Sequence, residues 1–408
     1  MRWHTMLFAV ALGLASVAFI GPTASAAADT PVLAFYYPWY NPENFHRDAM
    51  WDVPVTPYQS DSRSTIERQV REARDAGITG FISSWMGKGN RTDNNLATLL
   101  DVSKGTDFAS TIYFETGQAG LVSQGEIVDA LRYVVAKYGS HPNWARVGGK
   151  PAIFFWNPSA AGGVEFWQAV RSQVDPNGEW HWNVETDRPD SWLQVFDGIH
   201  LFSAASWTAD ATATYKSLKS KVEAASARTG KPKVWSAGVA PGWDNSRQGT
   251  PTRVTVGREN GGYYSRRWES AIASEPGAIT ITSWNEWGEG TAIEPGSSYG
   301  NLYLDITRRY AESYRQSRAG SAPTGFSFKL GFAALASQIP WIVGQPLEEE
   351  HHAANGDSLQ ATTTGLMVWR KSDNWTAFTN GARTWVNGGP HGIRERGNDE
   401  RFPWESAH

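Results

Sequence analysis

Two glutamates stand three positions apart in the run Ser283-Trp-Asn-Glu-Trp-Gly-Glu-Gly-Thr-Ala-Ile-Glu-Pro295. Glycoside hydrolysis needs two carboxyl groups, one protonated to assist the leaving oxygen and one ionised to stabilise or generate charge at the anomeric carbon. Glu286 and Glu289 are such a pair, and Trp284 and Trp287 beside them can exclude water and raise the pKa of an acid. The alternative is a solvated acidic loop, although surface loops seldom place two tryptophans among two carboxylates. The run therefore predicts a pair of catalytic carboxylates.

Glycines surround the second glutamate of this pair, at Gly288 and Gly290. Glycine lacks a Cβ atom and adopts backbone conformations that other residues avoid. The two glycines therefore predict a sharp turn that presents both carboxylates. Glu294 follows in the same segment, and its position leaves a structural and a functional role equally open.

The apolar stretch before the pair is one of eight short apolar runs between residues 29 and 318. These runs are rich in β-branched and aromatic residues without clean alternation, as in strands buried on both faces. They are Val32–Tyr37, Ile78–Trp85, Ser110–Glu115, Ala152–Trp156, Trp180–Glu185 (the weakest), Ile199–Ser203, Val234–Val239 and Ala278–Trp284. Helical stretches lie between them at Ser62–Ala76, Asn94–Ser103, Gln124–Tyr138, Val164–Val174, Ala209–Thr229, Tyr263–Ser274 and Leu302–Gln316.

This alternation predicts an α/β fold, a (β/α)8 TIM-type barrel over residues 29–318. The alternative is an open, doubly wound sheet. The first predicted strand is not followed by Gly-x-Gly-x-x-Gly, which disfavours a dinucleotide-binding version of that sheet.

Functional residues of such a barrel gather at the carboxyl ends of its strands. Most of the predicted strands end on an aromatic residue with a polar neighbour, and the chain has 21 tryptophans. Tryptophan combines a flat apolar face with a polar edge, which suits the C–H faces and hydroxyls of a sugar, although a large core also uses it. The predicted substrate-binding residues are Tyr37, Trp39, Tyr40, His46, Trp85, Glu115, Trp156, Trp243, Asp244, Asn285 and Trp287.

Two of these candidates have plain alternatives. Glu115 could bind a sugar hydroxyl or tune the catalytic pair, or it could form an ion pair with a barrel arginine such as Arg247. His46 lies in the loop after the first predicted strand and could line the mouth of the barrel, or it could simply be solvated.

The N-terminal residues 1–26 have the pattern of a signal peptide. Arg2 precedes an apolar stretch from Met6 to Ile20, and Ala24-Ser25-Ala26 offers a cleavage site with small residues. Fifteen apolar residues are short for a membrane span, the competing interpretation. The pattern predicts a secreted protein, and the lack of cysteine excludes disulfides and fits a bacterial source.

The composition and the absence of certain motifs argue against several other functional classes of protein. The formal charge of −4 gives no strong field for nucleic acid or an anionic membrane. Metal-binding and phosphate-binding motifs are absent from the sequence, so we expect neither metal nor cofactor. The expected partner is a carbohydrate substrate.

The chain changes character after residue 318. Residues 319–325 are typical of a linker, and residues 326–408 predict a small C-terminal module. A helix is expected at Lys329–Ser337, and short strands are expected at Gly365–Arg370, Asn374–Asn380 and Arg383–Asn387. The module resembles one that recurs at the ends of exported bacterial proteins. Its aromatic residues would suit glycan or cell-wall binding, or else packing on the barrel.

Four segments resemble glycoside hydrolase family 99, the endo-α-1,2-mannosidases and endo-α-1,2-mannanases, and their family-99-like relatives. They are Phe35-Tyr-Tyr-Pro-Trp-Tyr40, Ala76-Gly-Ile-Thr-Gly-Phe-Ile-Ser-Ser-Trp85, Pro241-Gly-Trp-Asp244 and Ile281-Thr-Ser-Trp-Asn-Glu-Trp-Gly-Glu-Gly-Thr291. The resemblance covers residues 32–310 and implies a (β/α)8 barrel that hydrolyses glycans with retention of anomeric configuration.

The same resemblance implies a division of labour between the two glutamates. Glu289 corresponds to the general acid/base, and Glu286 to the carboxylate that deprotonates the substrate's own 2-hydroxyl. That hydroxyl then attacks the anomeric carbon and gives a 1,2-anhydro sugar. The mannosidases usually have His where this chain has Gly288 and Gln where it has Ala292, which bears on the substrate more than on the chemistry. The alternatives are a silent glycan-binding protein and a polysaccharide-processing transferase.

Overall fold

The computed structural model describes residues 30–118, 120–204, 211–249, 255–318, 326–344, 346–362, 364–381 and 383–405. The predicted signal peptide and linker lie outside these residues, as do the first residues of the helix expected at Ala209–Thr229.

Eight parallel strands form a closed barrel within residues 30–318. In sheet order they are β3 (Thr111–Glu115), β2 (Gly80–Trp85), β1 (Val32–Tyr36), β11 (Ala278–Ile281), β8 (Val234–Val239), β7 (Gly198–His200), β6 (His181–Glu185) and β5 (Lys150–Trp156). Strand β5 pairs with β3 through Phe114 and Phe155, which closes the sheet. The predicted (β/α)8 barrel is confirmed, and the open-sheet alternative is excluded.

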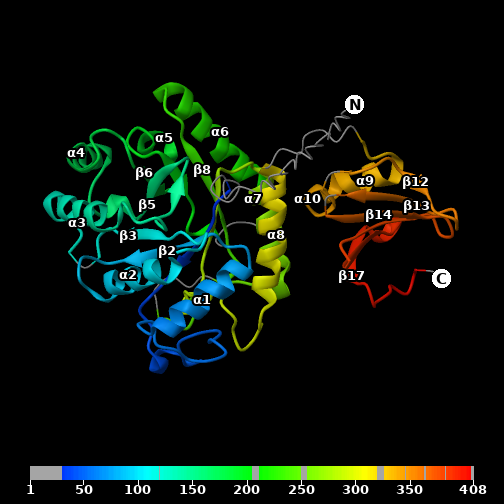
Figure 1. Cartoon of the computed structure of the whole chain (residues 1–408), viewed down its shortest axis with the longest axis horizontal. Coiled ribbons are helices and arrows are strands. Elements are labelled where there is room, and N and C mark those ends of the chain that lie inside the picture. Colours follow the sequence, from blue (N-terminus) through cyan, green and yellow to red (C-terminus); the bar gives the residue numbers. More distant parts are fainter. Residues whose placement is uncertain are drawn as a thin grey trace, which may run out of the picture.

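A helix follows each barrel strand and packs outside the sheet (Figure 1). The eight helices are α1 (Arg63–Asp75), α2 (Arg91–Ser103), α3 (Gln124–Tyr138), α4 (Val164–Val174), α5 (Pro189–Trp192), α6 (Thr212–Thr229), α7 (Gly262–Ala273) and α8 (Leu302–Arg318). The sequence did not predict α5, because one turn is too short to show a helical period.

The barrel has two apolar layers, as its strands face the helices on one side and the barrel axis on the other. Side chains such as Val32, Ala34 and Tyr36 pack against the helices, while Leu33 and Phe35 point inward. This alternation within β1 is the two-residue period of a strand. Because the barrel is filled, a substrate can reach only the loops at its ends.

The C-terminal module is a six-stranded antiparallel sheet with two helices on one face. Its strands run in chain order as β12 (His351–His352), β13 (Ser358–Thr362), β14 (Gly365–Arg370), β15 (Trp375–Thr379), β16 (Arg383–Asn387) and β17 (Ile393–Gly397). Helices α9 (Leu330–Gln338) and α10 (Pro340–Val343) precede the sheet. Phe332, Leu335 and Phe378 lie in its own hydrophobic core.

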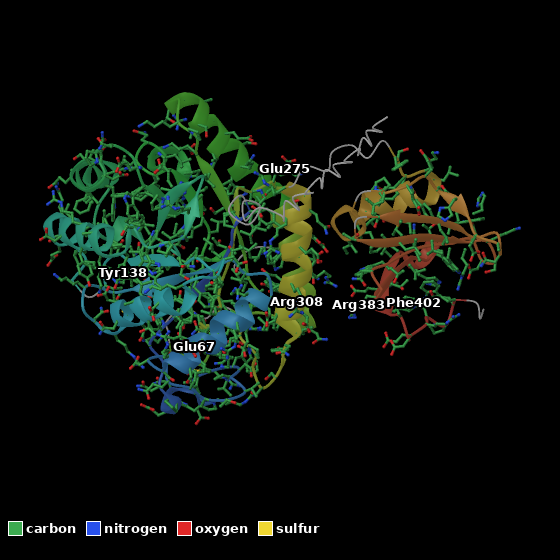
Figure 2. All side chains as sticks on the ribbon, in the orientation of Figure 1. Glu67, Tyr138, Glu275, Arg308, Arg383 and Phe402 are labelled. Carbon is green, nitrogen blue, oxygen red and sulfur yellow. The ribbon has the colours of Figure 1, made fainter. Side chains whose placement is uncertain are left out.

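The module meets the barrel at α8, the helix that faces it in Figure 1. Arg309 Nη1 of α8 lies 3.4 Å from Glu395 Oε1, and its guanidinium lies over the Trp385 ring at 5.9 Å. Glu395 also pairs with Arg383 at 2.7 Å, and Figure 2 shows Arg383 on the side of the module toward α8. Among the described residues, no helix is long and apolar enough to cross a membrane.

Candidate active site

The loop between β11 and α8 carries both candidate glutamates and is fastened to the end of β1. Trp284 N donates to Phe35 O at 2.8 Å. The Asn285 side chain accepts from Tyr37 N at 2.7 Å and donates to Tyr37 O at 3.0 Å. These bonds fix the start of the loop at the carboxyl end of the barrel, where the substrate must arrive.

Glu286 is held by a tyrosine hydroxyl and by its own backbone. Tyr40 Oη donates to Glu286 Oε1 at 3.2 Å, and Glu286 N donates to Ser283 Oγ at 2.7 Å. Burial raises the pKa of Glu286 well above 4.5, and the charges of Glu289 and Glu115 add to this, while the Tyr40 hydrogen bond opposes it. The Tyr40 hydrogen bond favours the ionised form of Glu286, as does a backbone hydrogen bond from Gly288.

Glu289 has a buried carboxyl group with a raised pKa. Its Oε2 atom is buried without a hydrogen-bond partner among the described residues. Burial raises its pKa to about 7, and the charge of Glu185 adds to the effect. The backbone is anchored because Asp244 N donates to Glu289 O at 2.8 Å. A carboxyl group with a pKa of about 7 is about half protonated at neutral pH, and this one keeps an oxygen free for a substrate.

The two glycines of the loop differ in what they permit. Gly290 has a φ of +62°, and a Cβ atom there would lie 3.0 Å from Asp244 O. Its left-handed conformation provides the turn that the sequence predicted. Gly288 is not in that region of φ, so the prediction of a backbone role is wrong for it; a side chain there would instead meet Gln248.

Two more carboxyl groups lie near the pair, at the ends of β3 and β6. Ser84 Oγ donates to Glu115 Oε1 at 2.7 Å. Burial raises the pKa of Glu115 to about 7, although the Ser84 hydrogen bond lowers it. The charges of Glu185 and Glu289 add to the rise. Burial likewise raises the pKa of Glu185 to about 7. The strongest charges acting on these groups are therefore other carboxylates.

Glu185 was not among the predicted site residues. It ends β6, whose run was the weakest strand candidate, so its strand-end position was given no weight. The available signal was the same one that found Glu115, a glutamate as the last residue of a barrel strand.

The raised pKa of Glu115 gives an expectation for stability. The pKa is about 7 in the folded chain and near 4.5 when the chain unfolds. Wild-type stability therefore falls as the pH rises from about 4.5 to about 7, by on the order of 3 kcal/mol. Glu115→Gln lacks this loss, so we expect it to be more stable than wild type at pH 8 and to lose that advantage at pH 5. Chemical denaturation at the two pH values measures the difference, and a pH-independent gap contradicts it.

Aromatic side chains line the same end of the barrel. Tyr37 packs against Trp39 with ring centroids 4.8 Å apart, and Trp39 is half-buried. Burial raises the pKa of Tyr37, and the next causes are Glu286, Glu115 and Glu289, so this ring lies among the carboxylates. The half-buried Trp156 ends β5.

Trp243 is also half-buried at this end, and it packs edge-on against Phe202 at 6.3 Å. Its Nε1 atom is buried without a partner among the described residues. Tyr113, which the sequence did not single out, lies among the same carboxylates, because Glu185, Glu115 and Glu289 raise its pKa after burial does.

Three of the predicted substrate-binding residues are instead structural. Trp85 is fully buried on the helix side of β2 and donates to Asp93 Oδ1 at 3.0 Å. Asn285 is fully buried, and its side-chain amide is hydrogen-bonded to the backbone of Tyr37. Trp287 is 2% exposed and donates to Tyr58 Oη at 3.3 Å. Asn285 and Trp287 thus position the loop between β11 and α8, whereas Trp85 joins β2 to α2.

Other candidates take positioning or surface roles. Asp244 is buried and accepts from Ser246 N at 2.9 Å, so its carboxylate shapes its own loop. His46 is exposed, as its solvated alternative expected. The ion pair between Glu115 and Arg247 is not formed, because the Arg247 guanidinium lies over the Trp51 ring at 4.3 Å.

Glu294 has a structural environment. It accepts hydrogen bonds from Tyr58 at 2.7 Å, Arg68 at 3.0 Å and Gln69 at 2.8 Å. These contacts tie the end of the loop between β11 and α8 to α1. Among the residues that the structure describes, no group of three or more His, Asp or Glu side chains could hold a metal ion.

Comparison with known proteins gives one family. Residues 53–320 match the family described as glycosyl hydrolase family 99. The glycoprotein endo-α-1,2-mannosidase of Mus musculus is 26% identical over 354 residues, which cover 70% of this chain and 75% of that protein. A related endo-α-1,2-mannosidase-like protein of Homo sapiens is 23% identical over 365 residues, covering 72% of this chain and 78% of its own.

A solved structure shares the barrel. The family 99 endo-α-mannosidase of Bacteroides thetaiotaomicron, in complex with bis-tris-propane, is 26% identical with a TM-score of 0.63. The match covers 71% of this chain and 98% of that one. The resemblance seen in the sequence is thereby confirmed, and the chain belongs to glycosyl hydrolase family 99 and is a glycoside hydrolase similar to the endo-α-mannosidases.

Proposed function

We propose that this chain is an exported, retaining, endo-acting α-mannosidase that cleaves a mannan-like polysaccharide. The observation that carries the proposal is the unequal environment of the two loop glutamates. Glu286 accepts from Tyr40, whereas Glu289 has a buried oxygen without a partner among the described residues and a pKa raised to about 7. The Tyr40 hydrogen bond stabilises the ionised form of Glu286 that a base needs, against the rise in pKa that burial causes. The unpartnered oxygen and raised pKa of Glu289 suit an acid.

In the first step, Glu289 gives its proton to the leaving glycosidic oxygen. Glu286 takes the proton from the 2-hydroxyl of the sugar, and O2 attacks the anomeric carbon as the glycosidic bond breaks. In the second step, Glu289 takes a proton from a water molecule, and the water oxygen attacks C1 and opens the 1,2-anhydro ring. Glu286 returns its proton to O2 as the ring opens. The two inversions at C1 give overall retention, and both glutamates regain their starting state.

The stereochemistry of this route favours an α-mannoside. Attack by O2 from the back requires O2 and the leaving oxygen to lie on opposite faces of the sugar ring, and α-mannosides meet this condition. The names of the related enzymes point to the same linkage, since those of mouse and rat are both endo-α-1,2-mannosidases.

The proposal also includes secretion of the protein and glycan binding by its C-terminal module. The signal-peptide pattern of residues 1–26 supports secretion from a bacterial cell. On the C-terminal module, Trp404 stacks on Phe402 at 4.9 Å and on His391 at 5.0 Å. Phe402 and Trp404 are half-buried and His391 is exposed. Accessible aromatic rings suit the apolar face of a sugar, which supports a role for the module in glycan or cell-wall binding.

The test is a screen of the mature protein against α-mannans with defined linkages and against other bacterial and plant glycans. Product masses over time distinguish endo from exo action, and NMR of the first product formed reports its anomeric configuration. We expect internal cleavage of an α-mannan with an α-configured product. Binding without any product would favour a silent binding protein, and transfer to added acceptors in place of hydrolysis would favour a transferase.

A further inference from the structure

A glutamine from another loop fills the space beside Gly288, the glycine that lies between Glu286 and Glu289 in the sequence. A Cβ atom at position 288 would lie 1.7 Å from Gln248 Nε2 and 3.5 Å from Glu286 Oε1. The Gln248 carboxamide and the Glu286 carboxylate therefore approach the same point. Since the φ of Gly288 lies outside the left-handed region, its lack of a side chain serves to make room for Gln248.

The loop that carries Gln248 is fastened on both sides. Asp244 N donates to Glu289 O at 2.8 Å, which joins the start of the loop to the catalytic segment. Arg247 donates to the backbone carbonyls of Arg47 and, at 3.2 Å, Met50 in the β1 loop. Gln248 N closes a turn onto Asn245 O at 3.1 Å. These contacts fix the backbone that places the Gln248 carboxamide beside Gly288 and near Glu286.

The carboxamide is free to bind a ligand. Gln248 is exposed, and its side chain makes no hydrogen bond within the part of the chain that the structure describes. A carboxamide offers two N–H donors and an acceptor, which match the hydroxyls of a sugar. It is also neutral, so it adds no charge to a site where neighbouring glutamates already raise the pKa of Glu286, Glu289 and Glu115.

We propose that Gln248 is a substrate-binding residue that determines which sugar is accepted beside Glu286. The inference rests on the proposed hydrolysis of a glycan by the Glu286 and Glu289 pair. Its carboxamide hydrogen-bonds a hydroxyl of the reacting sugar, at the place that a side chain at position 288 would otherwise occupy.

The test compares Gln248→Leu and Gln248→Ala with wild type on the best glycan from the screen and on the same glycan with one epimeric sugar. Loss of one hydrogen bond lowers kcat/KM by about tenfold. We expect that loss of kcat/KM on the preferred glycan and a smaller loss on its epimer. The ratio of the two kcat/KM values should therefore move toward one. Gln248→Asn keeps the carboxamide on a shorter chain and is expected to recover part of the preference.

A double-mutant cycle separates this contact from a general disturbance of the loop. Gly288→Ala displaces the carboxamide, so alone it should cost about as much as Gln248→Ala, and it should cost little more in the Gln248→Ala background. Gln194→Ala changes another exposed glutamine, between α5 and β7 at the opposite end of the barrel, and should leave kcat/KM unchanged.

Unchanged kcat/KM and unchanged preference in both Gln248→Leu and Gln248→Ala would overturn the inference while the proposed function stands. If wild type cleaves none of the glycans, the proposed function falls, and binding then decides the inference. In that case the affinities of the same glycans for wild type and Gln248→Leu are compared by calorimetry. Weaker binding by the variant supports the contact, and equal affinity, including no binding by either, rejects it.

Discussion

Glu289→Gln cleaves a natural glycan at least about a thousandfold more slowly than wild type, while its affinity for the glycan is retained. The carboxamide has nearly the shape of the carboxyl group but cannot give a proton to the leaving oxygen. Glu289 Oε2 has no protein partner among the described residues, so the substitution breaks no hydrogen bond within that part of the chain. Turnover is followed by product release from the glycan, and affinity by calorimetry.

Substrates with an activated leaving group test the reason for this loss. A glycosyl fluoride needs little help from an acid, so Glu289→Gln should break its C–F bond far faster, relative to wild type, than it breaks the natural linkage. Melting temperature and circular dichroism provide the control for folding. Equal losses on the fluoride and on the natural glycan would contradict the role of Glu289 as the acid.

The same assignment fixes the pH dependence of the wild-type enzyme. An acid with a pKa of about 7 is protonated below that pH, so kcat/KM should fall as the pH rises above about 7. Activity should also fall at low pH, because Glu286 must be ionised to act as the base. Burial and the charge of Glu289 raise the pKa of Glu286 well above 4.5, and the Tyr40 hydrogen bond opposes this rise. Glu289→Gln should lose the alkaline limb from its residual activity, and an unaltered profile would count against the assignment.

The barrel was predictable because its strands are buried on both faces and each is followed by a helix. The carboxyl ends of such strands then direct attention to Glu115, Glu286 and Glu289. A strand end does not say toward which face its last side chain points. Ser84 faces the axis and bonds Glu115, so the next residue, Trp85, must face the helices and cannot bind a substrate.

The contacts between loops could not be predicted from the sequence, for a different reason. Gln248 sits in a polar segment without periodicity, and its approach to Gly288 depends on attachments to two other loops. Two structural features commonly require glycine in a loop: a left-handed backbone conformation, and other atoms packed closely against the backbone. Composition alone cannot separate them, and in this loop Gly290 and Gly288 provide one case of each.

The second large effect is expected at the other glutamate. Glu286→Gln should lower kcat by at least about a thousandfold on the natural glycan and, unlike Glu289→Gln, should gain little from a fluoride leaving group. The reason is that the base toward O2 is needed whichever group departs. Tyr40 can still donate to the amide oxygen at this position, so the loop keeps its anchor. Parallel rates for both variants on both substrates measure this difference.

The decisive observation concerns the 2-hydroxyl itself. If Glu286 acts on O2 and not on the anomeric carbon, a substrate with fluorine in place of the 2-hydroxyl has no nucleophile. Wild type should then leave it uncleaved and carry no sugar ester, as intact-protein mass spectrometry would show. In the usual retaining pair, a fluorinated sugar accumulates as an ester on the nucleophilic carboxylate. An ester on Glu286 would therefore replace the 1,2-anhydro route with the ordinary one, while the two carboxylates would remain the catalytic pair.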